Sequence, residues 1–430
     1  MIRKTLISSL TNASMGQRLF RNAAIRRYRR GTPIVAGPEA RAAILYPSRR
    51  GSVGDFALML GALTGLREAG SEGPVVISFF PEDTWTDFPL PISTITRPIG
   101  WPFRWFNFCR QLSRFDCLGI IGADVIDGYY SARLTCDRLD IAAAGAGLGL
   151  RTCIMGFSYR KDPNEAALAR LRQVSSDIKL LSRDPASERN IVRLTGRRTV
   201  LSADLAFLMA PTQDSRRVSE VLAWIAAQRE RGRLVIGINC NRQVLPSSDP
   251  NEISRLVENY MFAMTAVMNS RPNVSFLIVP HDTRGQLSDL TLGEDLFSRC
   301  PAVVASNSRL ISEPWTASEI KAAAGALDLV VTGRMHLAIA ALGMGVPVVS
   351  LTYQDKFEGL YEHFDMPLAG APGEDALKEG VLFNLIEDGI RTIDTSRAQI
   401  RRKLPSVVAL ARRNIEILLG TGDKDSRGDA

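Results

Sequence analysis

The clearest structural signal in this chain is the stretch Val331-Thr332-Gly333-Arg334-Met335-His336, which reads as the end of a buried strand, a tight loop and the start of a helix. Apolar residues 337–344 continue the helix, and a second strand is predicted over 346–351. A strand, a helix and another strand in this order form the repeating unit of a parallel α/β sheet. Open sheets of this class bind ligands at the carboxyl ends of their strands. Arg334 and His336 are therefore placed where a small anion would bind.

The same alternation of strands and helices runs along most of the 430 residues, which is long enough for two domains. We predict an α/β protein with two doubly wound Rossmann-like domains, over 41–214 and 215–372, facing each other across a cleft. C-terminal helices are expected over 373–421 and a disordered polar tail over 422–430. The predicted strands are 42–46, 75–80, 118–124, 153–157, 178–181, 199–201, 233–239, 274–280, 310–311, 329–331 and 346–351, and the predicted helices are 56–68, 137–150, 219–229, 252–269, 316–326, 337–344, 375–388 and 396–419.

The net charge of +8 is concentrated near the start of the chain. Residues 1–50 hold eleven Arg and Lys residues and a single acid, Glu39, so residues 1–40 are predicted to form a basic N-terminal arm. Its charge is compatible with a solvated, partly disordered segment, or with attraction to an anionic membrane surface or an acidic polymer. No stacking motif or recognition module accompanies the charge, so we expect no nucleic-acid partner.

The cysteines and the hydropathy pattern bear on the cellular compartment. The six cysteines form no C-x-x-C pair, which argues against a zinc ribbon or a redox dithiol and favours reduced thiols. Neither a secretory signal nor an apolar run long enough to cross a membrane is evident. We therefore expect a cytoplasmic protein, with peripheral attachment to the inner face of the membrane as the alternative that the basic arm allows. The sequence does not indicate an oligomeric state.

A second candidate loop is Gly51-Ser52-Val53-Gly54-Asp55, which joins a predicted strand to a helix. Glycines let the backbone approach a ligand, and the amides at a helix start favour an anion. Asp55 is either the cap of that helix or a carboxylate that takes part in catalysis or sugar binding. Gly54, the residue before it, is a candidate for a backbone contact with the ligand.

Other polar residues follow predicted strands, and each has an ordinary structural explanation as well as a functional one. Lys356 and Arg183 are either solvated cations or contacts for a phosphate. His281, with Asp282, either supports a neighbouring ligand or forms a simple turn. The histidines and carboxylates lack the spacing of metal ligands, so no metal site is predicted.

Taken together, these segments resemble the polysaccharide pyruvyl transferase family, over roughly residues 42–370. The strongest part is similar to the family's R-L-H element, its G-V-P strand and its Y-D-x-K element. Ser52 stands where Asn is usual, Met335 where Leu is usual, and Gly122-Ala123-Asp124 where a glycine-rich turn is usual. The segments that carry the resemblance are Ser52–Asp55, Arg183-Asp184 with Ser187, Asp204–Phe207, Asp328–Ala338, Gly345–Ser350 and Tyr353–Lys356.

The resemblance implies a glycosyltransferase-B-like fold and transfer of a pyruvyl group, as a ketal, from phosphoenolpyruvate to a sugar of a cell-surface or exopolysaccharide. No cofactor is expected beside this donor, and the saccharide acceptor is either free or lipid-linked. It also implies that Arg334, His336 and Arg183 bind phosphoenolpyruvate.

The residue types fit such a reaction. Phosphoenolpyruvate carries a carboxylate and a phosphate, for which Lys356 offers a further cation beside the family's arginines. His336 is the candidate general acid and Asp55 the candidate base. The remaining site assignments are Met335 for phosphoenolpyruvate, and Gly54, Asp124 and His281 for the acceptor.

Two other functions are compatible with the sequence. A nucleotide-sugar glycosyltransferase would use the same fold, although the E-x₇-E pair that such enzymes often carry is absent after residue 328. A non-catalytic protein that binds anionic polymer would use the basic arm alone.

Overall fold

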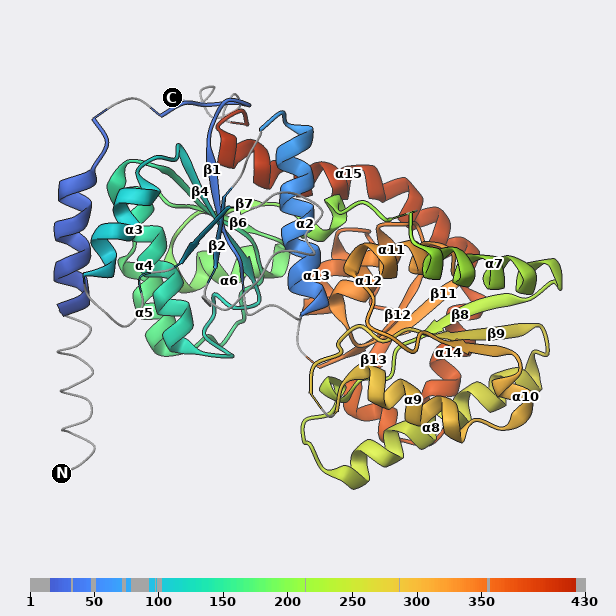
Figure 1. Ribbon diagram of the computed structural model, residues 1–430. Coiled ribbons are helices and arrows are strands. Elements are labelled where there is room, and N and C mark those ends of the chain that lie inside the picture. Colours follow the sequence, from blue (N-terminus) through green and yellow to red (C-terminus); the bar gives the residue numbers. More distant parts are fainter. Residues whose placement is uncertain are drawn as a thin grey trace, which may run out of the picture. The chain divides into compact units, whose positions relative to one another are not determined.

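A computed structural model describes residues 16–31, 34–47, 52–71, 75–78, 93–96, 98, 103–212, 214–285, 287–353 and 356–422 (Figure 1). Contacts divide the chain into two compact units. Unit 1 consists of Met1–Arg50, Ala62–Asp204 and Leu410–Ala430, and unit 2 of Gly51–Gly61 and Leu205–Ala409. The predicted domains are contiguous ranges, whereas two helices, α2 (Val53–Glu68) and α15 (Ile393–Leu419), contribute to both units.

Several predicted features lie outside the described residues. They are the first part of the basic arm (1–15), most of the tail (423–430), the end of the predicted strand 75–80, and Gly51, Gln354 and Asp355.

Unit 1 is built on a parallel sheet in which seven strands are described. The first strand of the chain lies inside the sheet. The next two strands are added on one side of it and the later strands on the other side, which is the Rossmann order. From edge to edge the strands are β3 (Ser93–Thr96), β2 (Val75–Ser78), β1 (Ala42–Leu45), β4 (Cys117–Ala123), β5 (Arg151–Phe157), β6 (Lys179–Ser182) and β7 (Val200–Leu201). Figure 1 shows α3 (Arg104–Leu112) and α4 (Ala132–Leu148) on one side of this sheet and α2 on the other. The other helices of unit 1 are α5 (Glu165–Gln173) and α6 (Pro185–Thr195).

Unit 2 repeats this order with six described parallel strands. From edge to edge they are β10 (Ser308–Leu310), β9 (Val274–Ile278), β8 (Leu234–Ile238), β11 (Leu329–Thr332), β12 (Val348–Thr352) and β13 (Gly370–Pro372). The helices are α7 (Arg216–Glu230), α8 (Pro250–Ser270), α9 (Asp289–Arg299), α10 (Ala302–Ala305), α11 (Ala317–Gly325), α12 (Met335–Leu342), α13 (Lys356–Glu362) and α14 (Val381–Arg391), with 3₁₀ turns η1 (Leu205–Leu208), η2 (Arg242–Val244) and η3 (Gly373–Leu377). The prediction of two doubly wound parallel-sheet units is confirmed.

Local sequence explains where several helices begin. Thr316 caps α11: its hydroxyl accepts from the amide of Glu319, whose carboxylate accepts from the Thr316 amide. This reciprocal capping box satisfies two donors that a helix start leaves open. Helix α8 begins at Pro250, directly after its cap Asp249. At the first position of a helix the amide has no partner inside the helix, so proline loses no hydrogen bond there.

Helix α9 was not predicted from the sequence, and its composition explains why. Its residues include Thr291 and Gly293, which are weak helix formers, and its apolar spacing is short. Packing supplies what propensity lacks, because Leu292 and Leu296 are buried in the core of unit 2. A tertiary contact therefore decides that this segment is a helix.

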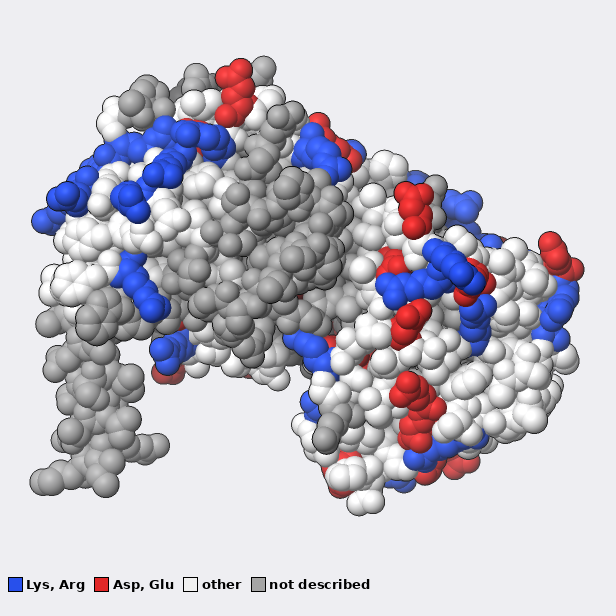
Figure 2. Space-filling model, viewed as in Figure 1, with Lys and Arg blue, Asp and Glu red and all other residues white. Residues whose placement is uncertain are grey.

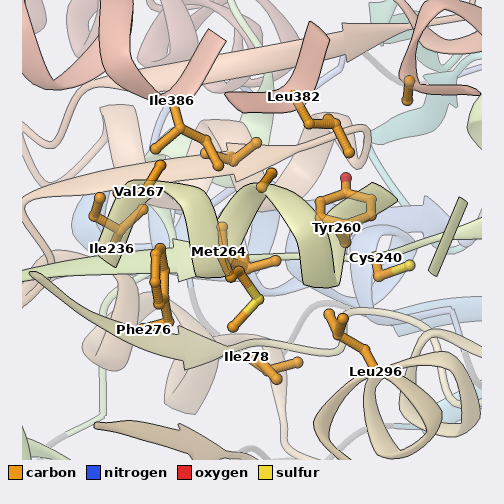
Figure 3. Packing of buried hydrophobic residues seen from close by; sticks show 14 of the residues in the cluster. Ile236, Cys240, Tyr260, Met264, Val267, Phe276, Ile278, Leu296, Leu382 and Ile386 are labelled. Atoms are coloured by element: carbon orange, nitrogen blue, oxygen red, sulfur yellow. The ribbon is translucent and has the colours of Figure 1, made fainter. Parts of the chain in front are cut away.

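The core of unit 2 lies between one face of its sheet and helices α8, α9 and α14 (Figure 3). Ile236 and Phe276 project from neighbouring strands, and Met264 and Val267 of α8 pack between them and Ile386 of α14. All are essentially buried, so apolar burial here stabilises both the sheet and the helices that cover it.

Part of the basic arm is folded. Residues 16–28 form a helix in unit 1, and Ala24 is fully buried in its core. Gln17 accepts a hydrogen bond from the indole of Trp105, 3.2 Å away, and Arg21 pairs with Asp140 at 2.5 Å. Arg30 then pairs with Asp116, at 2.7 Å. These contacts hold the helix against α3 and α4.

Phe276→Ala is expected to lower the free energy of unfolding by about 3–5 kcal/mol, because it removes a buried ring and leaves a cavity. Phe262→Ala on α8 is the matched control: its ring is 47% exposed, and its loss should cost less than about 0.5 kcal/mol. Urea unfolding followed by circular dichroism measures both. Equal losses would contradict the assignment of Phe276 to the core.

Candidate functional site

The loops that follow four strands of unit 2 converge at one edge of its sheet. The chain order reverses between β8 and β11, and neighbouring loops diverge at such a switch point, which leaves room for a ligand. Asn239 follows β8 and Arg334 follows β11. His281 comes after β9 and Tyr353 after β12. The predicted position of Arg334 at the carboxyl end of a strand is confirmed.

Arg334 is held by a buried carboxylate. Its Nε and Nη2 donate to Asp289 at distances from 2.5 to 3.2 Å, and the side chain of Asp289 is 0% exposed. Nη1 lies 3.5 Å from Oδ2 of Asp282. Burial alone would lower the pKa of Arg334, but the charge of Asp289 raises it above its ordinary value. The guanidinium is therefore charged and fixed in orientation.

A polar network around Asn239 holds this ion pair in place. Asn239 Nδ2 donates to Asp289 at 2.9 Å and to the carbonyl of Val279 at 3.0 Å. Its Oδ1 accepts from Asn241 at 2.9 Å and from the hydroxyl of Thr332 at 3.0 Å. The asparagine thus connects the ends of β8, β9 and β11. Both polar atoms of the Asn239 side chain are thus satisfied, as buried polar groups generally are.

The segment after β9 adds an imidazole and a second carboxylate. His281 is 5% exposed, and its amide donates to Asp289 at 3.1 Å. Burial, together with the charges of His336 and Arg334, lowers the pKa of His281 to about 3. Burial alone would raise the pKa of Asp282, but hydrogen bonds from Arg284 and the charge of Arg334 hold it below its ordinary value. At neutral pH His281 is therefore neutral and Asp282 charged.

The first turns of α2 belong to this unit and reach the same edge. Ser52 forms an isolated β-bridge with Asp282, and its hydroxyl accepts from the amide of Asp55 at 3.3 Å. Ser52 is therefore the cap of α2, and the interpretation of Asp55 as the cap is wrong: Asp55 is the third residue of the helix. A carboxylate in the first turn interacts favourably with the helix dipole.

Gly54 lies directly against His336, the second residue of α12. A Cβ added to Gly54 would overlap the imidazole ring, so a side chain at this position would displace His336. Gly333 is similarly confined by Val244 and Asn241. The structure thus brings together two loops that lie far apart in the sequence.

Lys356 and Met335 occupy different surroundings. Lys356 begins α13, and its ammonium lies 5.3 Å from the centre of the Tyr353 ring. The hydroxyl of Tyr353 donates to Gln243 at 3.2 Å. Met335 is 7% exposed at the start of α12, so its side chain is mostly packed inside the unit.

Arg183 belongs to unit 1, where its side chain is 1% exposed. It donates to Asp204 at 2.8 Å and to the hydroxyl of Ser158 at 2.7 Å. Asp184 next to it caps α6 through the amide of Ser187, at 2.7 Å. Burial alone would lower the pKa of Arg183, but the charges of Asp204 and two further carboxylates raise it. This geometry ties β5, β6 and the following segment together.

Asp124 also belongs to unit 1 and follows β4, next to the switch point of that sheet. It accepts a hydrogen bond from the hydroxyl of Tyr130 at 3.2 Å. Ala123 before it has a φ of 46°, a left-handed conformation that is uncommon for alanine. Arg183 and Asp124 are thus in unit 1, whereas the other predicted site residues are in unit 2.

Sequence reasoning missed Asn239, Asn241 and Asp289. Asn239 is the last residue of the predicted strand 233–239, so its position was a usable signal. Asp289 had no such signal, because it is the first residue of α9, a helix that the sequence pattern did not predict. Its role depends on a contact with Arg334, 45 residues away.

The described residues contain no group of three or more His, Cys, Asp or Glu side chains that could hold a metal ion. All six cysteines are free thiols, and burial raises the pKa of Cys109 and Cys117 to about 12. In the part of the chain that the structure describes, no helix is both long and apolar enough to cross a membrane.

The sequence model of the polysaccharide pyruvyl transferase family matches residues 53–355. A comparison with curated proteins finds no match.

Solved structures share the fold at low sequence identity. The S. aureus MnaA–UDP structure has a TM-score of 0.55 and 10% identity, covering 89% of this chain and 97% of that one. The N-terminal domain of Candida albicans trehalose-6-phosphate phosphatase has a TM-score of 0.54 and 11% identity, covering 91% and 98%. Neisseria meningitidis UDP-GlcNAc 2-epimerase, bound to UDP-GlcNAc, has a TM-score of 0.50 and 14% identity, covering 88% and 100%. The predicted glycosyltransferase-B-like fold class is confirmed.

Asp289→Asn is expected to lower the free energy of unfolding by about 3–5 kcal/mol, because it leaves the charge of Arg334 buried without its partner. Asp295→Asn is the control on the same helix. Asp295 pairs with Arg299, and both side chains are more than a third exposed, so its loss should cost less than about 1 kcal/mol. Urea unfolding curves decide between them. Similar losses would show that the Asp289 pair contributes little.

His281 should make the protein less stable as the pH falls from about 6.5 toward 5. In this window the unfolded chain binds a proton on this histidine and the folded chain does not, because its folded pKa is about 3. The free energy of unfolding should therefore drop by about 2 kcal/mol more in the parent protein than in His281→Gln. Urea unfolding at both pH values measures this, with His363→Gln as a control that keeps the drop. Parallel curves for parent and His281→Gln would refute a buried neutral imidazole.

Proposed function

The chain belongs to the polysaccharide pyruvyl transferase family, and on that premise we propose that it transfers a pyruvyl group from phosphoenolpyruvate to a sugar of a cell-surface or exopolysaccharide. The product is a ketal that bridges two hydroxyls of the sugar. The observation that carries the proposal is the contact between Gly54 and His336, which joins two of the loops that carry the resemblance to the family.

The donor binds at the switch point of unit 2. Asp289 occupies Nε and Nη2 of Arg334, so Nη1, 3.5 Å from Asp282, is the part of the guanidinium that faces the donor. A planar guanidinium suits either the carboxylate or the phosphate of phosphoenolpyruvate. Lys356 near Tyr353 supplies a second positive charge. His281, a predicted contact of the acceptor, is neutral and offers it a hydrogen bond without a charge.

In the reaction, C2 of the donor forms bonds to the oxygens of two sugar hydroxyls. One hydroxyl oxygen attacks C2 while the methylene carbon C3 takes up a proton and becomes a methyl group. The C2–O bond to phosphate then breaks, and the second hydroxyl oxygen bonds to C2. The two protons released by the hydroxyls balance the one that C3 gains and the one that leaves with inorganic phosphate.

His336 and Asp55 are the proposed proton carriers. His336 delivers the proton to C3 or steadies the departing phosphate, because an imidazole can donate near neutral pH. Asp55, in the first turn of α2, accepts the proton of the attacking hydroxyl. Each such transfer contributes about 10² to 10⁴ in rate.

The remaining assignments concern the acceptor and two further donor contacts. Gly54, His281 and Asp124 are predicted acceptor contacts, and the room that Gly54 leaves by lacking a side chain is filled by the ring of His336. Contacts of Arg183 and Met335 with phosphoenolpyruvate also stay predictions. The burial of both side chains is compatible with support of neighbouring residues.

His336→Ala should reduce phosphate release from phosphoenolpyruvate, in the presence of a sugar acceptor, by about 10² to 10⁴-fold. A panel of sugars identifies the acceptor by mass spectrometry of the pyruvylated product. Arg334→Lys keeps the charge that Asp289 needs but loses the fork, so donor binding should weaken by about tenfold or more in calorimetry.

His363→Ala and Arg309→Lys are the matched controls, since neither residue lies at the switch point. Unchanged phosphate release in His336→Ala would refute its assigned role. Calorimetric binding of a nucleotide sugar with no binding of phosphoenolpyruvate would instead favour a glycosyltransferase.

A further inference from the structure

The helix over residues 16–28 has one buried face and one basic face. Successive residues of a helix are 100° apart, which places Arg18 and Arg26 on one side of it, and Arg29 directly follows its end. These three and Arg27 are exposed, whereas Ala24 is buried and Ile25 and Tyr28 pack on the core of unit 1. The helix is therefore fixed to the unit with Arg18, Arg26 and Arg27 exposed to solvent, while Arg21 is buried in its pair with Asp140.

The neighbouring helix α3 extends this basic surface. Arg104, Arg110 and Arg114 are exposed on α3 and the turn after it. Residues 16–31 and 103–115 contain no Asp or Glu. Figure 2 shows Lys and Arg side chains gathered over the end of unit 1 that carries this helix.

Two acids near this surface are paired within unit 1. Asp116 is 1% exposed on its side chain and binds Arg30 and Arg41. Asp140 binds Arg21 and Arg170, each at 2.5 Å. Both carboxylates thus bind arginines other than the exposed Arg18, Arg26, Arg27 and Arg29.

Two apolar side chains project among these arginines. Leu19 is 62% exposed on the same helix, and Phe103, just before α3, is 58% exposed. The ring of Phe103 contacts that of Phe20 edge to face, with centroids 4.8 Å apart, so the two elements form one continuous surface. Exposed apolar side chains beside basic ones are the combination that interfacial membrane-binding helices present to a bilayer.

We propose that this surface, formed by Arg18, Leu19, Arg26, Arg27, Arg29, Phe103 and Arg104, docks the protein on an anionic lipid bilayer. Each arginine near such a surface strengthens partitioning about fivefold, and the apolar side chains enter the boundary between headgroups and acyl chains. A nucleic acid would also attract the arginines and has a stacking face in Phe103, but the more exposed Leu19 offers it neither a hydrogen bond nor a stacking face, whereas a bilayer takes up both apolar side chains. The attachment is peripheral and rests on no part of the proposed enzymatic function.

The test is co-sedimentation of the full chain with phosphatidylcholine vesicles, with and without phosphatidylglycerol. The parent protein should bind the anionic vesicles, less so at high salt. The partition coefficient of the quadruple (fourfold) variant Arg18→Gln/Arg26→Gln/Arg27→Gln/Arg29→Gln should be lower by a factor of at least about ten. Leu19→Ser should bind more weakly at every salt concentration, since its contribution is apolar.

A control variant removes the same charge from exposed positions of unit 2: Arg216→Gln/Arg231→Gln/Arg391→Gln/Arg402→Gln. It should bind like the parent, and thermal melts should show that all variants fold. Equal losses in the two fourfold variants, or equal binding to both kinds of vesicle, would overturn the proposal. So would preferential binding of DNA over anionic vesicles, or self-association in sedimentation velocity that Leu19→Ser abolishes.

Discussion

A parallel sheet sets the constraint on which the candidate site depends. Its strands run in one direction, so each must be followed by a crossover, and all carboxyl ends emerge at the same edge. Four loops that are dispersed along the sequence of unit 2 therefore meet, at Asn239, His281, Arg334 and Tyr353. The first turn of α2 joins them, although it lies far from all four in the chain. Convergence of polar groups here follows from the topology and needs no local motif.

Charge compensation then determines what these groups can do. A guanidinium that is largely buried is tolerated only when paired, and Asp289 provides the pair. The same contact limits Arg334, because two of its nitrogens are occupied and its orientation is fixed. A fixed cation suits recognition of one small anion better than of many, since little freedom is lost on binding.

The two arginines singled out in the sequence illustrate how far residue type alone can mislead. Arg183 and Arg334 both follow strands and both pair with a buried aspartate. Arg183, however, is almost completely enclosed in unit 1, while part of Arg334 remains exposed. The basic arm is a similar case. Its composition is compatible with a solvated tail, yet residues 16–28 form a helix that exposes arginines on one face and packs apolar residues such as Ala24 into unit 1 on the other.

The sequence by itself determined the class of fold, because alternating apolar strands and amphipathic helices are local patterns that one stretch of chain displays. It also placed Arg334 and His336 at a strand end, since that follows from a strand, a glycine and a helix in succession. Only the tertiary structure decided that Asp289 pairs with Arg334, that Gly54 borders His336 and that Ser52 caps α2. Contacts between distant segments depend on how helices and loops pack, and the burial that selects them is a property of the folded unit as a whole.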